Sequence, residues 1–318
     1  MTVTDSRPRD LSEIKYLVTH SGYFHADDVC AAAVLQTIMP EAGIVRTRDA
    51  SLIRAYEKQA ITFDVGGRCD PAAGYFDHHM SGARERAYGV VYSSFGLIWQ
   101  AYGRDYLRAL DIEEVFIEDM FEAFDADVVL PIDKIDTGSL SPAQIGETAA
   151  ISLPAVVDAF NAVDPDQSNA QFMKIVNMTS KMLEAKTMQY LGIAKDHQMV
   201  AEAVTEQAGS QVLELPHSAD FQPSLDKLGA DHVLYVIQPS SSGGFGLSCA
   251  RPHAGTYENL RDLPAEWGGK TGADLEEATG VEGATFCHTA LFFAACDTLE
   301  AARELAQLAL PDDPEPSM

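Results

Sequence analysis

Short apolar runs that end near a histidine or an aspartate recur through the N-terminal part of the chain. The runs at 14–18, 60–63 and 75–76 are rich in β-branched and aromatic residues, and a helix-like segment at 27–35 separates the first two. Strands that alternate with helices are typical of an α/β protein with a parallel sheet. In such sheets ligands bind beyond the carboxyl ends of the strands. The pattern therefore predicts that the polar residues after these runs lie close together.

Histidines and aspartates gather at the ends of the predicted elements. They include the consecutive Asp77-His78-His79 and, upstream, His20, His25, Asp27 and Asp64. Imidazole nitrogens and carboxylate oxygens together suit Mn²⁺, Fe²⁺, Co²⁺ or Zn²⁺. We therefore expect one metal-dependent active site assembled from the ends of several strands.

A site for two cations about 3.5–4 Å apart needs roughly six to eight protein ligands and usually one bridging carboxylate. The expected ligands are His20, His25, Asp27, Asp64, His78 and Asp136. Asp64 is the best candidate for the bridge, because it ends a strand and Gly66-Gly67 leave room on both sides. Asp136 is expected in a carboxylate-rich turn at 131–138. Asp28 has a simpler explanation as a helix-start residue, since a carboxylate there suits the positive end of the helix dipole.

The same residue types have ordinary structural explanations. A single histidine near a strand end is commonly a hydrogen-bonded polar residue, and a single aspartate in a turn is commonly a cap. However, four of the nine histidines fall within 20–79, each beside an aspartate or a strand end. That concentration favours the metal interpretation of the whole cluster. Among the other histidines, His288 ends a predicted buried strand and is a candidate substrate contact.

The length of 318 residues allows two domains. We expect an α/β metal-binding domain at 14–207, in which 153–207 forms a helical connection. A smaller α+β domain is expected at 208–310, with tails at 1–13 and 311–318. The core candidates on the predicted helices are Val115, Phe116, Met120, Phe121, Phe124, Met173, Val176, Met178, Met182, Leu183 and Met188.

The net charge of −26, from 48 acidic and 22 basic side chains, restricts the partners of the chain. Non-specific affinity for nucleic acid comes mainly from cations that replace counterions on phosphates, so extended duplexes are disfavoured. A short single-stranded RNA or a nucleotide remains compatible if local arginines and bound cations reverse the sign inside the site. The alternative is an acidic surface that only aids solubility.

The sequence shows neither a membrane-spanning run nor a secretory signal. No apolar run reaches the length of about 18 residues that a membrane helix needs. The first residues lack the apolar core of a secretory signal. The five cysteines are scattered, without a CxxC motif, which indicates neither a disulfide framework nor a zinc ribbon. We expect a cytoplasmic protein without membrane partners; the sequence leaves a homo-oligomer open.

Several motifs together resemble one known superfamily. They are Thr-His-Ser-Gly-Tyr-Phe-His-Ala-Asp-Asp at 19–28, Phe-Asp-Val-Gly-Gly at 63–67, Phe-Asp-His-His at 76–79 and Ile-Asp-Lys-Ile-Asp-Thr-Gly at 132–138. This combination is similar to the DHH phosphoesterase superfamily and, more narrowly, to the melanocyte-proliferating-gene exonuclease family (the Myg family). Weaker similarity at 261–267 and 280–288 extends the resemblance over most of the chain.

The resemblance implies a parallel-sheet DHH-type metal domain, a smaller substrate-binding domain and an active site in the cleft between them. It also implies a dinuclear site, usually manganese, and relatives in the Myg family are described as 3′→5′ exoribonucleases. By motif, His20, His25 and Asp27 match the first metal motif and Asp64 matches the bridging aspartate. His78 and Asp136 match later ligands, and His79 matches a histidine that contacts substrate phosphate.

We therefore expect a metal-dependent phosphodiester hydrolase, most simply a 3′→5′ exoribonuclease that uses two Mn²⁺ ions. Asp64 and His79 are the expected catalytic residues, and Asp77 is expected to orient His78 or His79. The residues expected to offset phosphate charge are His79, Arg84, Arg86, Arg261 and His288.

Two alternatives stay open. The strongly negative charge favours a small-nucleotide phosphatase or pyrophosphatase over an enzyme that processes long RNA. A metal-binding regulatory protein without catalysis is the second alternative, because Ala294-Ala295 stands where Myg relatives tend to carry two glycines, and methyl groups there would hinder a close approach of phosphate to the backbone. Asp28 also departs from the family pattern, in which a glutamate is usual.

Overall fold

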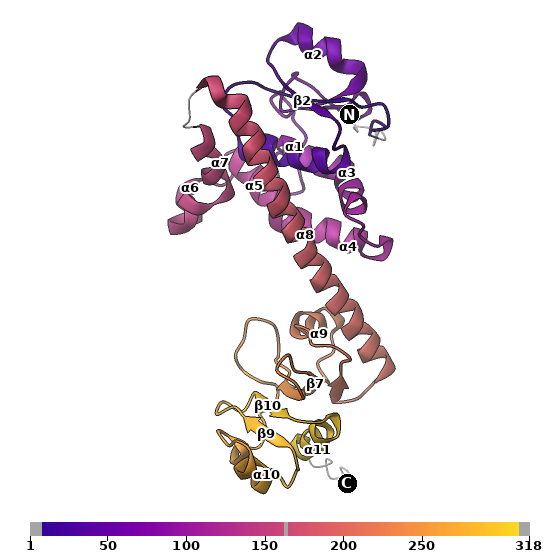
Figure 1. The fold of residues 1–318 in the computed structure, drawn as a ribbon, viewed down its shortest axis with the longest axis vertical. Coiled ribbons are helices and arrows are strands. Elements are labelled where there is room, and N and C mark those ends of the chain that lie inside the picture. Colours follow the sequence, from indigo (N-terminus) through magenta and orange to yellow (C-terminus); the bar gives the residue numbers. More distant parts are fainter. Residues whose placement is uncertain (1–7, 162–164, 312–318) are drawn as a thin grey trace. The chain divides into compact units, whose positions relative to one another are not determined.

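The computed structural model describes residues 8–161 and 165–311, and these form two compact units, 1–191 and 192–318 (Figure 1). The division falls within the long helix α8 (Ser168–Glu206). The sequence placed the domain boundary later, between residues 207 and 208. The expected helical connection is present as α7 (Leu153–Asn161), a short 3₁₀ turn (Pro165–Gln167) and α8.

The first unit contains a five-stranded sheet in the order β2-β1-β3-β5-β4. Its strands are β1 (Tyr16–Thr19), β2 (Gly43–Arg46), β3 (Ala60–Phe63), β4 (Cys69–Asp70) and β5 (Tyr75–Phe76). All neighbouring strands are parallel except β4, which pairs antiparallel with β5. The α/β class and the three strands predicted from the apolar runs are therefore confirmed.

Helices cover this sheet and pack on one another. They are α1 (Ala26–Ile38), α2 (Ala50–Tyr56), α3 (Ser94–Ala109), α4 (Glu114–Phe124), α5 (Leu130–Asp136), α6 (Pro142–Ile145) and α7, with 3₁₀ turns at Glu57–Gln59, Pro71–Ala73 and Gly146–Ile151. Every residue of α1 from Ala26 to Leu35 is buried, because α1 contacts β1, α3, α5 and α7. The small side chains at 31–33 allow these neighbours to approach closely. This burial fixes the first turn of α1, which carries Asp27 and Asp28.

The predicted turn at 131–138 is wrong. A π-helical segment (Asp125–Val129) continues α4 directly into α5, with Pro131 in its first turn. Proline lacks an N–H, and Pro131 comes just after the π-helical segment, in which the amide of Leu130 bonds Asp125 O and the regular α-helical hydrogen bonding is interrupted. Asp133 and Asp136 consequently lie one turn apart on α5, on neighbouring positions of one face.

Three of the core candidates are also wrong, since Val115, Met178 and Met188 are exposed. On α4 the buried positions include Phe116, Met120 and Phe124. These follow one another at a spacing of four, so the apolar stripe passes beside position 115.

The second unit contains a mixed five-stranded sheet in the order β6-β7-β8-β10-β9, in which only β6 and β7 are parallel. Its elements are β6 (Val212–Glu214), α9 (Gln222–Leu228), β7 (Tyr235–Pro239), β8 (Phe245–Cys249), a 3₁₀ turn (Ala265–Trp267), α10 (Ala273–Thr279), β9 (Ala284–Cys287), β10 (Phe293–Cys296) and α11 (Leu299–Ala309). Its core includes Leu247, Leu275 and Leu305. Within the described ranges, no helix has both the length and the apolarity that crossing a membrane would require.

Candidate metal centre

The cluster lies at the carboxyl ends of three adjacent parallel strands. His20 follows β1, Asp64 follows β3, and Asp77-His78-His79 follows β5. Because β1, β3 and β5 are neighbours in the sheet, these side chains meet at one edge. The first turn of α1 and the last residue of α5 add further carboxylates to the same place.

Asp64 stands at the centre of the cluster. Its Oδ2 atom lies 3.0 Å from His20 Nε2, and its Oδ1 atom lies 3.1 Å from His78 Nε2. His78 Nε2 also lies 3.4 Å from Asp136 Oδ2 and 3.8 Å from Asp27 Oδ2. One carboxylate that reaches a different histidine with each oxygen has the arrangement that a bridging ligand needs.

The donor atoms of the cluster fall into overlapping groups whose members lie within 4.8 Å of one another. The groups are His20-His25-Asp64, Asp64-His78-His79, His25-Asp27-Asp136 and Asp27-Asp28-Asp64. All six ligands expected from the sequence occur in these groups, together with Asp28 and His79. Among the described residues, no hydrogen bond reaches the buried atom Asp27 Oδ1, and Asp28 Oδ2 has only the ion-pair contact with His20 Nε2 at 3.3 Å. Buried carboxylate oxygens without donors are costly unless a cation pairs with them, so this donor set fits divalent cations.

The pKa values of the clustered aspartates depend on their burial and on their charged neighbours. Burial, and next the charges of Asp64 and Asp136, hold the pKa of Asp27 well above its ordinary value. Burial raises the pKa of Asp28 to about 7 against the opposing charge of His20. For Asp64, burial would raise the pKa, but the hydrogen bonds from His20 and His78 outweigh it and hold the pKa far below the ordinary value. Bound cations would favour the ionised form of all of these carboxylates.

The backbone and its neighbours fix the direction of Asp64. Asp64 has φ +55°, a left-handed conformation that is uncommon outside glycine. Its amide donates a hydrogen bond to Phe76 O at 3.2 Å, and Ser94 Oγ donates to its Oδ1 at 3.1 Å. The amide of Ser94 also donates to Asp27 Oδ2 at 3.3 Å. Ser94, at the start of α3, therefore holds two of the carboxylates at once.

Asp77 is not a member of the metal groups, and it supports His79. Its Oδ2 accepts a hydrogen bond from the amide of Gly67 at 2.6 Å, and its Oδ1 accepts one from the amide of His79 at 3.1 Å. The same Oδ1 lies 2.9 Å from His79 Nδ1. Asp77 is buried, whereas the His79 side chain is 62% exposed. The contact orients an accessible imidazole at the mouth of the cluster, and it involves His79 rather than His78.

The arginines expected at the site differ in their surroundings. Arg84 is exposed, with its guanidinium 5.5 Å from the Tyr92 ring. The Arg86 side chain is only 8% exposed, and it is engaged by Asp133 (Nε to Oδ2, 2.6 Å) and Asp125 (Nη2 to Oδ1, 2.8 Å). These two carboxylates hold Arg86 in the protein interior. Its guanidinium is therefore already paired and is not free to contact phosphate.

The two remaining candidates lie in the second unit. Arg261 donates from Nε to Ala309 O at 3.1 Å, and His288 Nδ1 accepts a hydrogen bond from the amide of Ala290 at 3.0 Å. The His288 ring packs 4.4 Å from the Phe292 ring. Their part in substrate binding stays a prediction, as does the cleft between the domains.

Sequence reasoning missed several residues of the centre. Asp28 was explained as a helix-start residue, and it does accept a hydrogen bond from the His25 amide at 2.9 Å; its Oδ2 also lies 3.3 Å from His20 Nε2. Its position next to Asp27 was the available signal. Arg48 Nη2 lies 3.0 Å from His20 Nδ1. The two residues are far apart in the sequence, so no local pattern predicts this contact.

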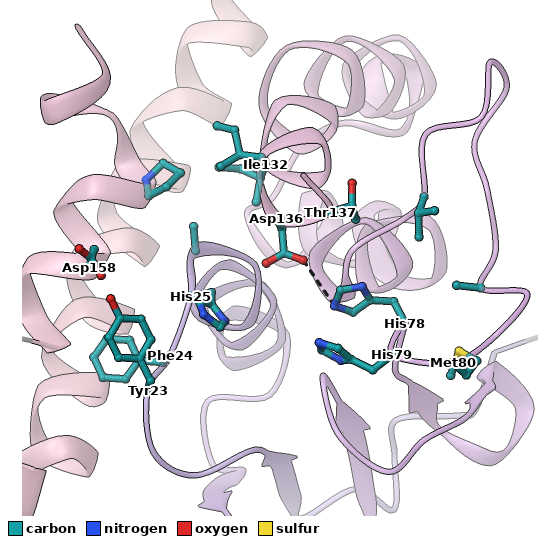
Figure 2. A pocket seen from close by; sticks show the side chains of 15 residues that line it. Tyr23, Phe24, His25, His78, His79, Met80, Ile132, Asp136, Thr137 and Asp158 are labelled. Atoms are coloured by element: carbon teal, nitrogen blue, oxygen red, sulfur yellow. Dashed lines mark ion pairs between the residues drawn. The ribbon is translucent and has the colours of Figure 1, made fainter. Parts of the chain in front are cut away.

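A cavity of about 740 Å³ opens beside the cluster. Figure 2 shows His25, His78, His79 and Asp136 projecting toward it, with the ion pair between His78 and Asp136 marked. The cavity is lined entirely by residues of the first unit.

The comparisons with known proteins show the family of this chain. The model of the family described as MYG1_exonuc, uncharacterised protein family UPF0160, matches residues 16–310. The MYG1 exonuclease of Mus musculus is 26% identical, covering 98% of this chain and 89% of its own length. The MYG1 protein of Dictyostelium discoideum is 25% identical, covering 94% and 97%. The chain thus belongs to the MYG1 exonuclease family, which confirms the resemblance and the expectation of a phosphoesterase enzyme.

Two solved structures with a likeness to this chain are more distant. A pGpG-specific phosphodiesterase from Vibrio cholerae, PggH, covers 92% of this chain and 97% of its own, with 14% identity and a TM-score of 0.31. RecJ from Thermus thermophilus covers 94% and 50%, with 13% identity and a TM-score of 0.23.

Proposed function

We propose that this chain is a 3′→5′ exoribonuclease that hydrolyses short single-stranded RNA with two Mn²⁺ ions held by the cluster. The observation that carries the proposal is the position of Asp64 between His20 and His78, amid three further carboxylates. Membership of a family whose relatives include proteins named exonucleases supports the reaction.

The ligands would divide around Asp64. His20 and His25 form one donor group with it, and His78 and His79 form another. Asp27 belongs to one group with Asp64 and to a second with His25 and Asp136. Two bound divalent cations would supply an activated water and neutralise charge on the scissile phosphate. The chain itself contributes rigid carboxylates whose burial excludes bulk water, so that their electrostatic interactions are weakly screened.

His79 is the residue of the centre best placed to meet substrate. Its ring is exposed, and Asp77 holds its Nδ1 side, which leaves Nε2 free to face a ligand. When both ring nitrogens carry a proton, Nδ1 donates to Asp77 and Nε2 would donate to a phosphate oxygen as charge develops there. His79→Gln should therefore lower kcat more than it weakens metal binding.

The alternative is a small-nucleotide phosphatase or pyrophosphatase. None of the residues that line the cavity is a lysine or an arginine, and the net charge is −26. Both observations disfavour a long polyanion, because each extra phosphate would lack a protein cation. They are compatible with an exonuclease only if the substrate is short.

The test removes metal from the purified protein, restores Mn²⁺ and adds a short RNA labelled at its 5′ end. We expect a ladder of shortened, labelled products that depends on Mn²⁺ and is absent in Asp64→Asn. The matched control is Asp105→Asn, a residue on α3 outside the cluster whose side chain pairs with Arg108. This variant should give the same ladder as the natural sequence.

The other outcomes separate the candidates. Release of orthophosphate from mononucleotides or pyrophosphate, with the RNA intact, would favour the alternative. If Asp64→Asn kept its turnover, the bridging role would be lost. If none of these substrates changed, the proposal of catalysis would be overturned.

A further inference from the structure

The cavity beside the metal centre has two chemically different sides. The cluster side presents imidazoles and the Asp136 carboxylate. The other surfaces include Met80, Ile132, Ile135 and Tyr23. Because lysine and arginine are absent from the lining, phosphate has a counter-charge only where cations are bound. The apolar surfaces instead suit an uncharged, flat group attached to that phosphate.

Tyr23 offers such a group a stacking surface. Its side chain is 54% exposed although it lines the cavity, and its ring lies 5.5 Å from the ring of His25 at an angle of 52°. Bases stack on exposed aromatic rings with a gain of about 1–3 kcal/mol each. Stacked there, a base would be adjacent to a residue of the metal centre.

The wall that carries Tyr23 is rigid and includes an acceptor. Asn161 binds the backbone of Phe24 in both directions, accepting from its amide at 3.1 Å and donating to its carbonyl at 2.7 Å. Phe24 is itself buried against the Phe172 ring at 5.4 Å. These contacts tie the 20–25 loop to α7, on which Asp158 lies one turn before Asn161.

Asp158 and Tyr23 therefore share one wall of the cavity, and Figure 2 shows both on the side away from His78 and His79. The Asp158 side chain is exposed, and within 8–161 and 165–311 no hydrogen bond or ion pair engages its carboxylate. A carboxylate accepts hydrogen bonds and donates none at neutral pH. It would select a base that presents N–H groups.

We propose that this cavity is a nucleobase subsite in which Tyr23 stacks on the base and Asp158 accepts hydrogen bonds from its edge. Guanine is the preferred base, because its N1–H and 2-amino groups are adjacent donors that match both oxygens of one carboxylate, a strong bidentate arrangement. The subsite volume of about 740 Å³ accommodates a nucleotide. The inference rests on the proposed phosphoester hydrolysis, for which it names the substrate class.

The first test is binding to the Mn²⁺-loaded full-length protein by calorimetry, with GMP, AMP, CMP, UMP and ribose 5-phosphate as probes. We expect GMP to bind tightest, and ribose 5-phosphate, which lacks a base, to bind about tenfold or more weakly. Tyr23→Ala should abolish most of that difference, and Tyr23→Phe, which keeps the ring, should retain it. Asp158→Asn should weaken GMP about tenfold relative to the other nucleotides.

The second test measures kcat/KM for 5′-phosphorylated dinucleotides of each base and for the same backbone without bases. The guanine dinucleotide should be the best substrate, and its advantage over the abasic one should fall in Tyr23→Ala. Both Tyr23 and Asp158 are exposed, so these variants should fold.

Equal affinity for GMP and ribose 5-phosphate would overturn the subsite, whatever is hydrolysed. A base preference that survives Tyr23→Ala would overturn the stacking role in the same way. If no dinucleotide is hydrolysed but GMP binds with the expected preference, the proposed exonuclease activity fails while the subsite stands.

Discussion

Asp64 combines a left-handed backbone with contacts to two histidines and a serine. A non-glycine residue in this conformation costs on the order of 1–3 kcal/mol and persists only where its surroundings fix it. Here those surroundings are the hydrogen bond from the Asp64 amide to Phe76 O and the hydrogen bond from the Ser94 hydroxyl to Asp64 Oδ1. The strained backbone of Asp64 therefore places its carboxylate between His20 and His78 before any cation binds.

Ser94→Ala tests this positioning at the scale of one residue. The change removes the hydroxyl that donates to Asp64 while keeping the backbone donor to Asp27. Loss of such a supporting contact typically weakens metal affinity or activity about 10–100-fold, and we expect a Mn²⁺ affinity in that range by calorimetry. Ser141→Ala, whose hydroxyl bonds Gln144 outside the centre, should bind Mn²⁺ like the natural sequence. Equal affinities of the two variants would contradict the role of Ser94.

At the scale of elements, the close approach of α3 to α5 determines where Asp136 lies. A Cβ atom at Gly96 on α3 would collide with the carboxylate of Asp133 on α5. Asp133 is buried, and it accepts hydrogen bonds from Ser93 and from Arg86. Only glycine permits this contact, which secures α5 one turn before Asp136.

Gly96→Ala should therefore force α5 away from α3. Overpacking of this kind costs about 1–3 kcal/mol of folding free energy, which urea denaturation measures, and we also expect a weaker affinity for Mn²⁺. Gly192→Ala on α8 is the matched control, because a Cβ there meets nothing within 4 Å. It should stabilise the helix by up to about 1 kcal/mol and leave Mn²⁺ binding unchanged. Destabilisation by both variants to the same extent would show that the contact with Asp133 is not the cause.

At the scale of the whole molecule, the metal centre belongs to one of the two units. All of its candidate ligands lie before residue 192. A ligand that binds only the folded state stabilises it by about 2.7 kcal/mol at a hundredfold excess over Kd. Because the clustered carboxylates repel one another, the first unit should be less stable without metal than with metal bound.

Mn²⁺ should thus slow hydrogen exchange in β1, β3 and α1 far more than in β8 and β10, with mass spectrometry as the readout. In Asp64→Asn the protection of the first unit should largely disappear. Uniform protection of both units by Mn²⁺, or none at all, would argue against a site confined to the first unit.

The local sequence determined the strands β1, β3 and β5 and the polar residues that follow them. Apolar runs and strand ends are local features, and the parallel alternation with helices places their ends at one edge. His20, Asp64 and His78 were therefore predictable as neighbours. The α5 helix was not, because Pro131 is typical of turns as well as of first helical turns, and a π-helical segment that continues α4 has no local signature.

Only the tertiary structure decided the roles of Ser94, Gly96, Asp133 and Arg86. Each acts through a partner far along the chain, such as Arg86 on Asp133 or Ser94 on Asp64, and no spacing in the sequence encodes such a pair. Arg86 carries the charge expected of a phosphate contact, yet packing buries it between two carboxylates. The candidate ligands follow from residue type and strand order, which the sequence determines. The residues that position those ligands depend on which helices pack together, and only the tertiary structure decides that.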